Sequence, residues 1–423
     1  MKSVLIVFET AFRYSWQGST SRILDVSRAL SGRGWNCTLL AGAADRVTPG
    51  VSPENEFVGS VVRTPFSGIY PQYLRGRLPR WMYREYLSLT GRGHRVRDPE
   101  RGWPARASDW YTGNRPERPD MVIGMTTGHV GSLVAARRIA DHFASPLVLE
   151  FQDPCPSLEM KTHAAELAAL EQTVQASALI LTTTRSMAED IAVRHSVSRD
   201  RIVPVYMSYD EAKPPVRPDD SGRSTVILHA GALAGGQGRN VRIVVEALAK
   251  AIARHPEYEE RLGLDLLGAG VGGAEAIRLA RDLGIGRIVR LLPEEPRNEA
   301  LARMSRSGIL LLVKYADPKY SSQIPGKLFQ YLGRGLPILG VMPVKSEAAD
   351  ILQQSGLGAV FDNQDLDGIT GFISEIAVDA ERLSARYAPN WDFIQQFSLA
   401  SLGSQLDNLL SGVCRSSTDR RTG

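Results

Sequence analysis

The sequence predicts an α/β protein of two domains, each built on a parallel sheet. The chain has 423 residues, which is more than one hydrophobic core usually serves. In both halves, short apolar runs alternate with amphipathic stretches, a rhythm typical of βα units. Residues 209–224 contain three prolines and no apolar periodicity, and they separate the two halves. We therefore expect two Rossmann-like domains joined by a linker.

The first domain is expected to comprise residues 1–208. Its first apolar run, Val4 to Val7, is too short for a signal-peptide core or a membrane span, and it predicts a β-strand. The stretches between the apolar runs have helical periodicity with polar faces. The predicted strands are 3–8, 37–41, 121–124, 147–151, 178–183 and 202–205, and the predicted helices are 21–33, 130–143, 162–175 and 185–195.

Residues 52–118 interrupt this rhythm and are rich in glycine, proline and arginine. A long insertion in an α/β domain is usually functional or mobile. Between residues 63 and 118, arginines alternate with tyrosines and tryptophans, a mixture that suits a membrane surface, a phosphorylated acceptor or single-stranded nucleic acid. The formal charge of +4 is too small to argue for nucleic acid, which we exclude from the predicted partners. Peripheral membrane contact and a solvated loop serving a small soluble acceptor remain as alternatives.

The second domain is expected to comprise residues 225–388, where the βα rhythm restarts. Its predicted strands are 225–230, 264–267, 288–292, 308–313, 336–339 and 358–361. Residues 389–412 predict a C-terminal helix with apolar anchors that crosses back to the first domain. The polar and basic residues 413–423 are expected to be disordered.

Three cysteines occur in the chain, and their spacing matches neither a disulfide framework nor a metal site. They are Cys37, Cys155 and Cys414. We expect a reducing compartment, hence a cytoplasmic protein, with no structural metal and no cofactor.

Two glycine-rich turns of the second half follow predicted strands. Gly231 to Arg239 opens a helix, and such a turn lets backbone N–H groups approach a phosphate; the alternative is a flexible turn. Gly268, Gly270 and Gly273 match GxGxxG, but the strand about 20 residues later does not end in an acidic residue, which disfavours a dinucleotide site. No GxxxxGK[ST] motif occurs, so a P-loop is excluded.

Residues 321–339 carry the most specific motif of the chain, SSQIPGKLFQYLGRGLPIL, after an apolar strand. This stretch resembles the donor-site motif of the retaining GT4-type glycosyltransferases of the GT-B fold, whose common form is "iPsKlfEYlaaGkPil". The likeness extends in order over most of the chain outside residues 52–118. It includes Asp120 and the strand ending in Gln152 and Asp153, where the family usually has arginine before the aspartate.

The resemblance implies a donor site in the second domain. A loop and a helix N-terminus would hold the phosphates and sugar of the donor, with Lys327 as the cation that neutralises phosphate. Gln330 would take the place of the family's glutamate on the nucleotide ribose, and an amide there loses charge-assisted strength worth roughly 1 kcal/mol or more. The expected donor-binding residues are Gly231, Arg239, Gly268, Gly270, Ser322, Gln323, Ile324, Pro325, Gly326, Lys327 and Gln330.

In the first domain, we expect side chains at the carboxyl ends of strands to face the ligands, as in other α/β sheets. His129 is a candidate contact to the donor sugar or a structural histidine. Asp153 is a candidate for binding sugar or acceptor hydroxyls or a helix cap. With Lys327, these two complete the predicted catalytic set. Gly18, Ser19 and Thr20, which precede a helix, resemble the family's first-domain glycine loop on the acceptor side.

The implied activity is that of a hexosyl- or glycosyltransferase: transfer of a sugar from a nucleoside-diphosphate sugar to an acceptor hydroxyl, in a cleft between two facing domains. The resemblance implies retention of anomeric configuration. Lys327, Arg239 and helix N-termini could stabilise the leaving diphosphate, so we expect no metal ion. The acceptor would be a glycan, a lipid-linked saccharide or a natural-product aglycone. Two alternatives remain open, a nucleotide-sugar epimerase or hydrolase on the same fold, and a catalytically weak protein that binds nucleotide sugars.

Overall fold

The computed structural model describes residues 2–12, 18–42, 53–64, 102–115, 117–156, 164–210, 225–233 and 241–422. The chain divides into two compact units. The first comprises Met1–Met207 with Ala400–Gly423, and the second comprises Ser208–Leu399.

The first unit contains a sheet of seven parallel strands in the order β3-β2-β1-β4-β5-β6-β7. Both faces of its central strands are buried, as expected for a parallel sheet between helices. The strands are β1 (Lys2–Val7), β2 (Trp35–Ala41), β3 (Ser60–Arg63), β4 (Met121–Thr126), β5 (Leu147–Phe151), β6 (Leu179–Thr182) and β7 (Ile202–Pro204). All six predicted strands are confirmed. The seventh, β3, was missed because it is short and lies in the segment that interrupts the rhythm.

The helices of the first unit pack an apolar core against this sheet. They are α1 (Gly18–Ser31), α4 (Trp103–Asn114), α5 (Val130–Phe143), α6 (Ala164–Ala176) and α7 (Arg185–Arg194), with the 3₁₀ turns η1 (Pro53–Glu56) and η3 (Arg199–Arg201). Within the expected insertion, α4 is an ordinary core helix that packs on α5. Its Trp103 is fully buried and its Tyr111 is 5% exposed. Residues 65–101, which hold most of the predicted basic and aromatic mixture, lie outside the described residues.

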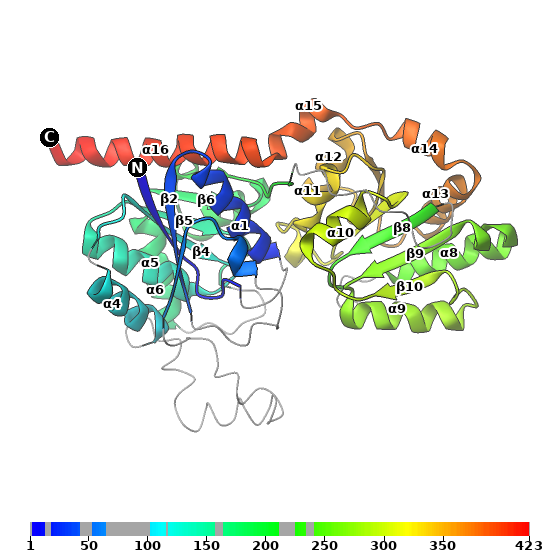
Figure 1. The fold of residues 1–423 in the computed structure, drawn as a ribbon, viewed down its shortest axis with the longest axis horizontal. Coiled ribbons are helices and arrows are strands. Elements are labelled where there is room, and N and C mark those ends of the chain that lie inside the picture. The colour runs from blue at the N-terminus through cyan, green and yellow to red at the C-terminus, as the bar shows by residue number, and fades with distance from the viewer. Residues whose placement is uncertain are drawn as a thin grey trace, which may run out of the picture. The chain divides into compact units, whose positions relative to one another are not determined.

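The second unit contains a sheet of six parallel strands in the order β10-β9-β8-β11-β12-β13. Figure 1 labels three of them, β8, β9 and β10. The strands are β8 (Thr225–Ala230), β9 (Leu262–Leu267), β10 (Val289–Leu292), β11 (Ile309–Val313), β12 (Ile338–Val341) and β13 (Gly358–Phe361). All six match strands predicted from the sequence. The order reverses between β8 and β11, and α/β sheets bind ligands beyond the carboxyl ends of strands at such a point.

Helices cover the second sheet and bury a core that includes β8, β9 and β11. They are α8 (Arg242–Arg254), α9 (Gly270–Asp282), α10 (Arg297–Met304), α11 (Lys327–Leu332), α12 (Glu347–Gln354), α13 (Leu366–Val378), α14 (Ala380–Arg386) and α15 (Trp391–Ile394), with the 3₁₀ turns η4 (Pro256–Glu260), η5 (Pro318–Tyr320) and η6 (Gln395–Phe397).

The C-terminal helix α16 (Leu399–Thr422) packs on the first unit, beside the N-terminus (Figure 1). Trp35 Nε1 donates a hydrogen bond to Asp407 Oδ1 at 2.9 Å, and Lys2 Nζ donates one to Ser411 Oγ at 2.6 Å. The expectation that residues 413–423 are disordered was wrong, since the helix continues to Thr422. Each residue added to an existing helix gains one hydrogen bond without a new nucleation cost, so a polar sequence can extend it.

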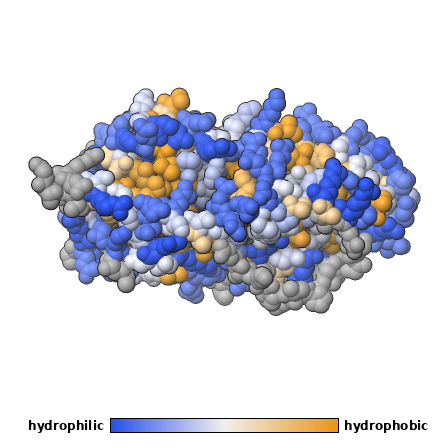
Figure 2. Space-filling model, turned by 90° about the horizontal axis from the view of Figure 1, so that it is seen from above, coloured by the Kyte–Doolittle hydropathy of each residue, from blue (hydrophilic) through white to orange (hydrophobic). Residues whose placement is uncertain are grey.

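Among the described residues, no helix is long and apolar enough to cross a bilayer. The face drawn in Figure 2 is mainly hydrophilic where it is coloured, with the hydrophobic residues gathered in a few groups.

Candidate functional site

The turn after β8 brings Gly231 against Lys327, the first residue of α11. Gly231 has φ +99°, a left-handed conformation that favours glycine, and its N–H donates to Leu267 O at 2.7 Å. A Cβ atom at this position would lie 3.1 Å from Lys327 Nζ. The absence of a side chain therefore leaves room for the ammonium group at the carboxyl edge of the sheet.

His229, near the end of β8, holds this ammonium group. Its ring is fully buried, and Nδ1 lies 2.9 Å from Leu311 O while Nε2 lies 3.1 Å from Lys327 Nζ. A carbonyl oxygen can only accept, so Nδ1 carries the proton and Nε2 accepts a hydrogen bond from Lys327. Sequence reasoning missed His229, although a histidine next to a glycine turn at a strand end was a usable signal.

The second glycine turn lies next to the first. Gly268 and Gly270 have φ +62° and +59°, and α9 begins at Gly270. The N–H of Leu233, just beyond Gly231, donates to Ala269 O at 3.2 Å, so the two turns are joined backbone to backbone. The structure thus places Gly231, Gly268 and Gly270 at one edge of the sheet, with Lys327 beside Gly231. Arg239 lies outside the described residues.

The loop before α11 is held by Lys314, which directly follows β11. Lys314 is 3% exposed, and its Nζ donates to Tyr320 O at 3.0 Å and to Ser321 O at 3.4 Å. Burial lowers the pKa of Lys314. The predicted donor loop follows immediately, and its residues Ser322, Gln323, Ile324, Pro325 and Gly326 are half-buried. Their backbone leads into Lys327, which is half-buried as well.

Gln330 lies one turn further along α11, and its amide binds the start of the segment that follows the first unit. Its Nε2 donates to Ser208 O at 3.0 Å, and its Oε1 accepts from the Asp210 N–H at 3.4 Å. Both the Nε2 and the Oε1 atom of Gln330 are therefore hydrogen-bonded to backbone groups. These contacts do not test the ribose contact predicted for Gln330.

In the first unit, the predicted side chains also lie at the carboxyl edge of the sheet. His129 is the N-cap of α5, and its carbonyl oxygen accepts a hydrogen bond from Thr126 Oγ1 at 2.6 Å. Asp153 lies just beyond β5 and is half-buried, and burial raises its pKa. Gly18, Ser19 and Thr20 form the first turn of α1, and Thr20 is buried.

Glu9, two residues beyond β1, belongs to the same edge and was missed from the sequence. It is 8% exposed, and its N–H donates to Ser132 Oγ at 3.0 Å. A Cβ atom on Gly131 would lie 3.3 Å from Glu9 Oε2, so this carboxylate lies against the first turn of α5. A carboxylate is favourable at a helix N-terminus. An acidic residue directly after the first apolar run was the available signal.

The backbone of the first unit near Asp153 is fixed by a buried ion pair. Arg22 of α1 and Glu150 of β5 are almost fully buried, with Nε–Oε1 and Nη2–Oε2 distances of 3.0 and 3.1 Å. Arg22 Nη1 also donates to Tyr206 O at 2.8 Å. This arginine therefore joins α1 to β5 and to the chain that leaves β7.

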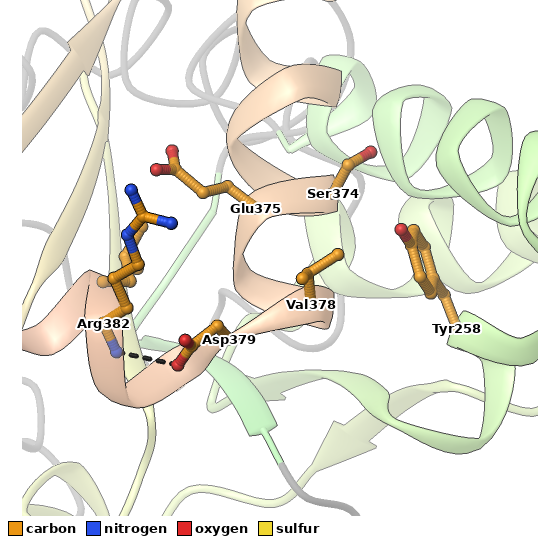
Figure 3. A pocket seen from close by; sticks show the side chains of 7 residues that line it. Tyr258, Ser374, Glu375, Val378, Asp379 and Arg382 are labelled. Carbon is orange, nitrogen blue, oxygen red and sulfur yellow. Dashed lines mark hydrogen bonds between the residues drawn. The ribbon is translucent and has the colours of Figure 1, made fainter.

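A separate hollow of about 290 Å³ lies on the second unit between η4, α13 and α14 (Figure 3). Tyr258, Glu375 and Arg382 are among the side chains around it, and the Arg382 N–H donates to Asp379 Oδ1 at 2.8 Å. Because η4 leads into the amino end of β9, this hollow lies away from Lys327 and the carboxyl edge. Among the described residues, no group of three or more His, Cys, Asp or Glu side chains is arranged to hold a metal ion.

No protein-family model and no curated protein matches this sequence. Solved structures match over nearly the whole chain. A sucrose-phosphate synthase from Thermosynechococcus elongatus aligns with a TM-score of 0.64 at 14% identity, covering 98% of this chain and 100% of that chain. The apo form of the lipopolysaccharide outer core galactosyltransferase WaaB aligns with a TM-score of 0.59 at 16% identity, covering 97% and 99%.

A third structure, described as trehalose-6-phosphate from E. coli bound with UDP-2-fluoro glucose, aligns with a TM-score of 0.63 at 11% identity, covering 97% of this chain and 99% of that one. These neighbours are GT-B glycosyltransferases. The chain has the GT-B fold. At these identities the likeness establishes the fold, and the GT-B fold accounts for two parallel sheets whose carboxyl edges carry the predicted residues.

Proposed function

We propose that this protein is a glycosyltransferase that moves a sugar from a nucleoside-diphosphate sugar to an acceptor hydroxyl, with retention of configuration and without a metal ion. The observation that carries the proposal is the ammonium group of Lys327, held by His229 beside the side-chain-free Gly231 at the carboxyl edge of the second sheet. The structural neighbours support it, since one is described as bound with UDP-2-fluoro glucose.

The chemistry of sugar transfer requires stabilisation of charge on the leaving group. When the bond from the anomeric carbon to phosphate breaks, negative charge grows on the nucleoside diphosphate. Lys327 would neutralise this charge, and the backbone N–H groups of the turns at Gly231 and Gly268 would approach the phosphates closely. His229 accepts a hydrogen bond from Lys327 through a neutral ring nitrogen, so this contact places no negative charge beside the ammonium group.

The residues of the first unit are assigned to the sugar and the acceptor. His129, Asp153 and the α1 turn at Ser19 and Thr20 lie at the carboxyl edge of the first sheet. Asp153 can accept hydrogen bonds from sugar hydroxyls, and Glu9 is a second carboxylate at this edge. Retention is proposed to follow from assistance by the leaving phosphate oxygen to the incoming acceptor hydroxyl.

We propose a cytoplasmic location, which all three cysteines, as free thiols, support. The acceptor is proposed to be a glycan, a lipid-linked saccharide or an aglycone. Membrane contact through residues 63–118 gains no support from the described part of that segment. There, Trp103 and Tyr111 are buried in the core of the first unit.

The proposal is tested by thermal unfolding with UDP, GDP, dTDP, ADP and CMP, with and without magnesium. A ligand that binds only the folded chain raises the unfolding temperature. We expect one nucleoside diphosphate to stabilise the wild type without metal and to lose this effect in Lys327→Ala. Lys250→Ala is the matched control, since Lys250 lies on α8 and pairs with Asp367 on the surface. Stabilisation that persists in Lys327→Ala would contradict the assignment.

A further inference from the structure

The segment 208–210, directly after the first unit, is bound along its length by Gln330 of α11, by Arg334 just after this helix and by Arg297 of α10. Gln330 binds Ser208 O and the Asp210 N–H. Arg334 Nη2 donates to Asp210 O, and Arg297 Nη2 lies 3.7 Å from Asp210 Oδ2. Each peptide group of this segment is thus fixed to the body of the second unit.

Tyr209, between these two residues, packs on the end of α11. A Cβ atom on Gly333 would lie 2.5 Å from Tyr209 Cδ2, so the ring occupies the space that any other residue would fill. The Tyr209 N–H donates to Phe397 O at 2.9 Å, and the Phe397 ring lies 5.1 Å from the ring of Phe329 on α11. The segment therefore forms a packed layer over the helix that begins with Lys327.

The two contacts of Gln330 need one donor and one acceptor on the same side chain. Only an amide supplies both, because a carboxylate would place an oxygen against Ser208 O and leave that carbonyl without its donor. This requirement accounts for glutamine at a position where the resemblance leads one to expect glutamate.

We propose that Gln330 is a positioning residue that fixes residues 208–210 to α11, and that it does not hold the ribose of the donor. The inference rests on the proposed function only in taking Lys327 and α11 as the donor site. It implies that Gln330 makes no contribution to discrimination between a ribonucleotide and its 2′-deoxy counterpart.

The first experiment needs no ligand. Hydrogen exchange is measured by mass spectrometry for peptides that contain residues 208–210, in wild type, Gln330→Met and Gln353→Met. Methionine has nearly the volume of glutamine and lacks its hydrogen bonds, and Gln353 is an exposed residue of α12. We expect faster exchange of these peptides in Gln330→Met alone. Exchange equal to that of the control would overturn the proposal.

The second experiment compares the tightest-binding ribonucleoside diphosphate among UDP, GDP and ADP with its 2′-deoxy form. Isothermal titration gives the ratio of the two dissociation constants in wild type and in Gln330→Met. We expect the ratio in Gln330→Met to agree with the ratio in the wild type within about twofold, because a residue that does not touch the ribose cannot change it. A fall of fivefold or more in Gln330→Met would show that Gln330 reads a ribose hydroxyl and would overturn the proposal.

The two experiments also separate this inference from the proposed function. If no nucleoside diphosphate binds the wild type, the proposed function fails, while the exchange measurement still decides whether Gln330 fixes residues 208–210.

Discussion

Lys327 Nζ lies 3.1 Å from Nε2 of His229, whose other ring nitrogen is bound to the carbonyl oxygen of Leu311. The imidazole is therefore held in one tautomer by a strand neighbour, and it directs the ammonium group to one place. A histidine without any direct contact to substrate would thereby contribute to donor binding.

We expect His229→Leu to weaken nucleoside diphosphate binding by about tenfold, because loss of one hydrogen bond to a charged group frees Lys327 to adopt other positions. Isothermal titration measures the effect. His255→Leu is the control, since His255 is half-exposed next to Tyr258 on the same unit. Unchanged binding in His229→Leu would show that the histidine does not position Lys327.

Gly231→Ala is expected to lower both stability and nucleotide binding. The substitution places a side chain at φ +99°, which costs about 1 kcal/mol, and brings Cβ to 3.1 Å from Lys327 Nζ. Gly284→Ala separates the two effects, because Gly284 has φ +78° with open space around it. Urea unfolding should show similar losses in both variants, while titration should show weaker binding only in Gly231→Ala. Equal binding in the two variants would rule out a steric link to Lys327.

We expect that replacing one partner of the buried ion pair between Arg22 and Glu150 strongly lowers the free energy of unfolding. Glu150→Gln leaves a buried guanidinium without its counter-charge, and we expect a loss of about 3–5 kcal/mol in the free energy of unfolding. Glu54→Gln is the control, because its partner Arg63 is partly exposed. Urea denaturation of both variants measures the difference. A similar small loss in both would mean that Arg22 finds adequate partners in the carbonyl groups of Val205 and Tyr206.

Burial raises the pKa of Asp153, so the folded state disfavours its ionised form. At about pH 3.5 the carboxyl is largely neutral in folded and unfolded chains, and Asp153→Asn should have little effect on stability. As the pH rises through the unfolded-state pKa and then through the raised folded-state pKa, the wild type loses stability that the variant keeps. Urea unfolding at about pH 3.5 and at neutral pH should show Asp153→Asn as more stable than the wild type only at neutral pH.

Asp282→Asn, the same substitution at an exposed residue of α9, is the control. An Asp153→Asn variant that is less stable than the wild type at neutral pH would mean that the carboxylate is held by favourable contacts.

The sheets were predictable from the sequence because strands of parallel sheets are continuous apolar runs, and twelve such runs became strands. Short β3 and the core helix α4 were not, because they lie in a segment of mixed composition where burial depends on tertiary contacts. Trp103 is fully buried, although its stretch of sequence also carries Arg101 and Arg106, and this burial cannot be read from the local sequence.

Part of the candidate site was predictable as well. The turns at Gly231 and Gly268 stood out as glycine-rich residues that follow predicted strands, and Lys327 followed from the resemblance of residues 321–339 to a donor-site motif. His229 and Glu9 did not, because their roles depend on the neighbouring strand and helix, His229 through Leu311 and Glu9 through Ser132. The contacts of Gln330 join residues about 120 positions apart, a pairing that no local pattern contains.

The most direct test of sugar transfer is consumption of the donor itself. Nucleotide sugars that match the stabilising diphosphate are incubated with the protein and candidate acceptor extracts, and released nucleoside diphosphate is quantified. We predict release from one nucleotide sugar by the wild type and by Lys250→Ala, and a rate at least about 100-fold lower in Lys327→Ala, as for removal of one group that stabilises transition-state charge. Binding of the diphosphate with no release from any nucleotide sugar would contradict the account and identify a protein that binds nucleotide sugars without transferring them.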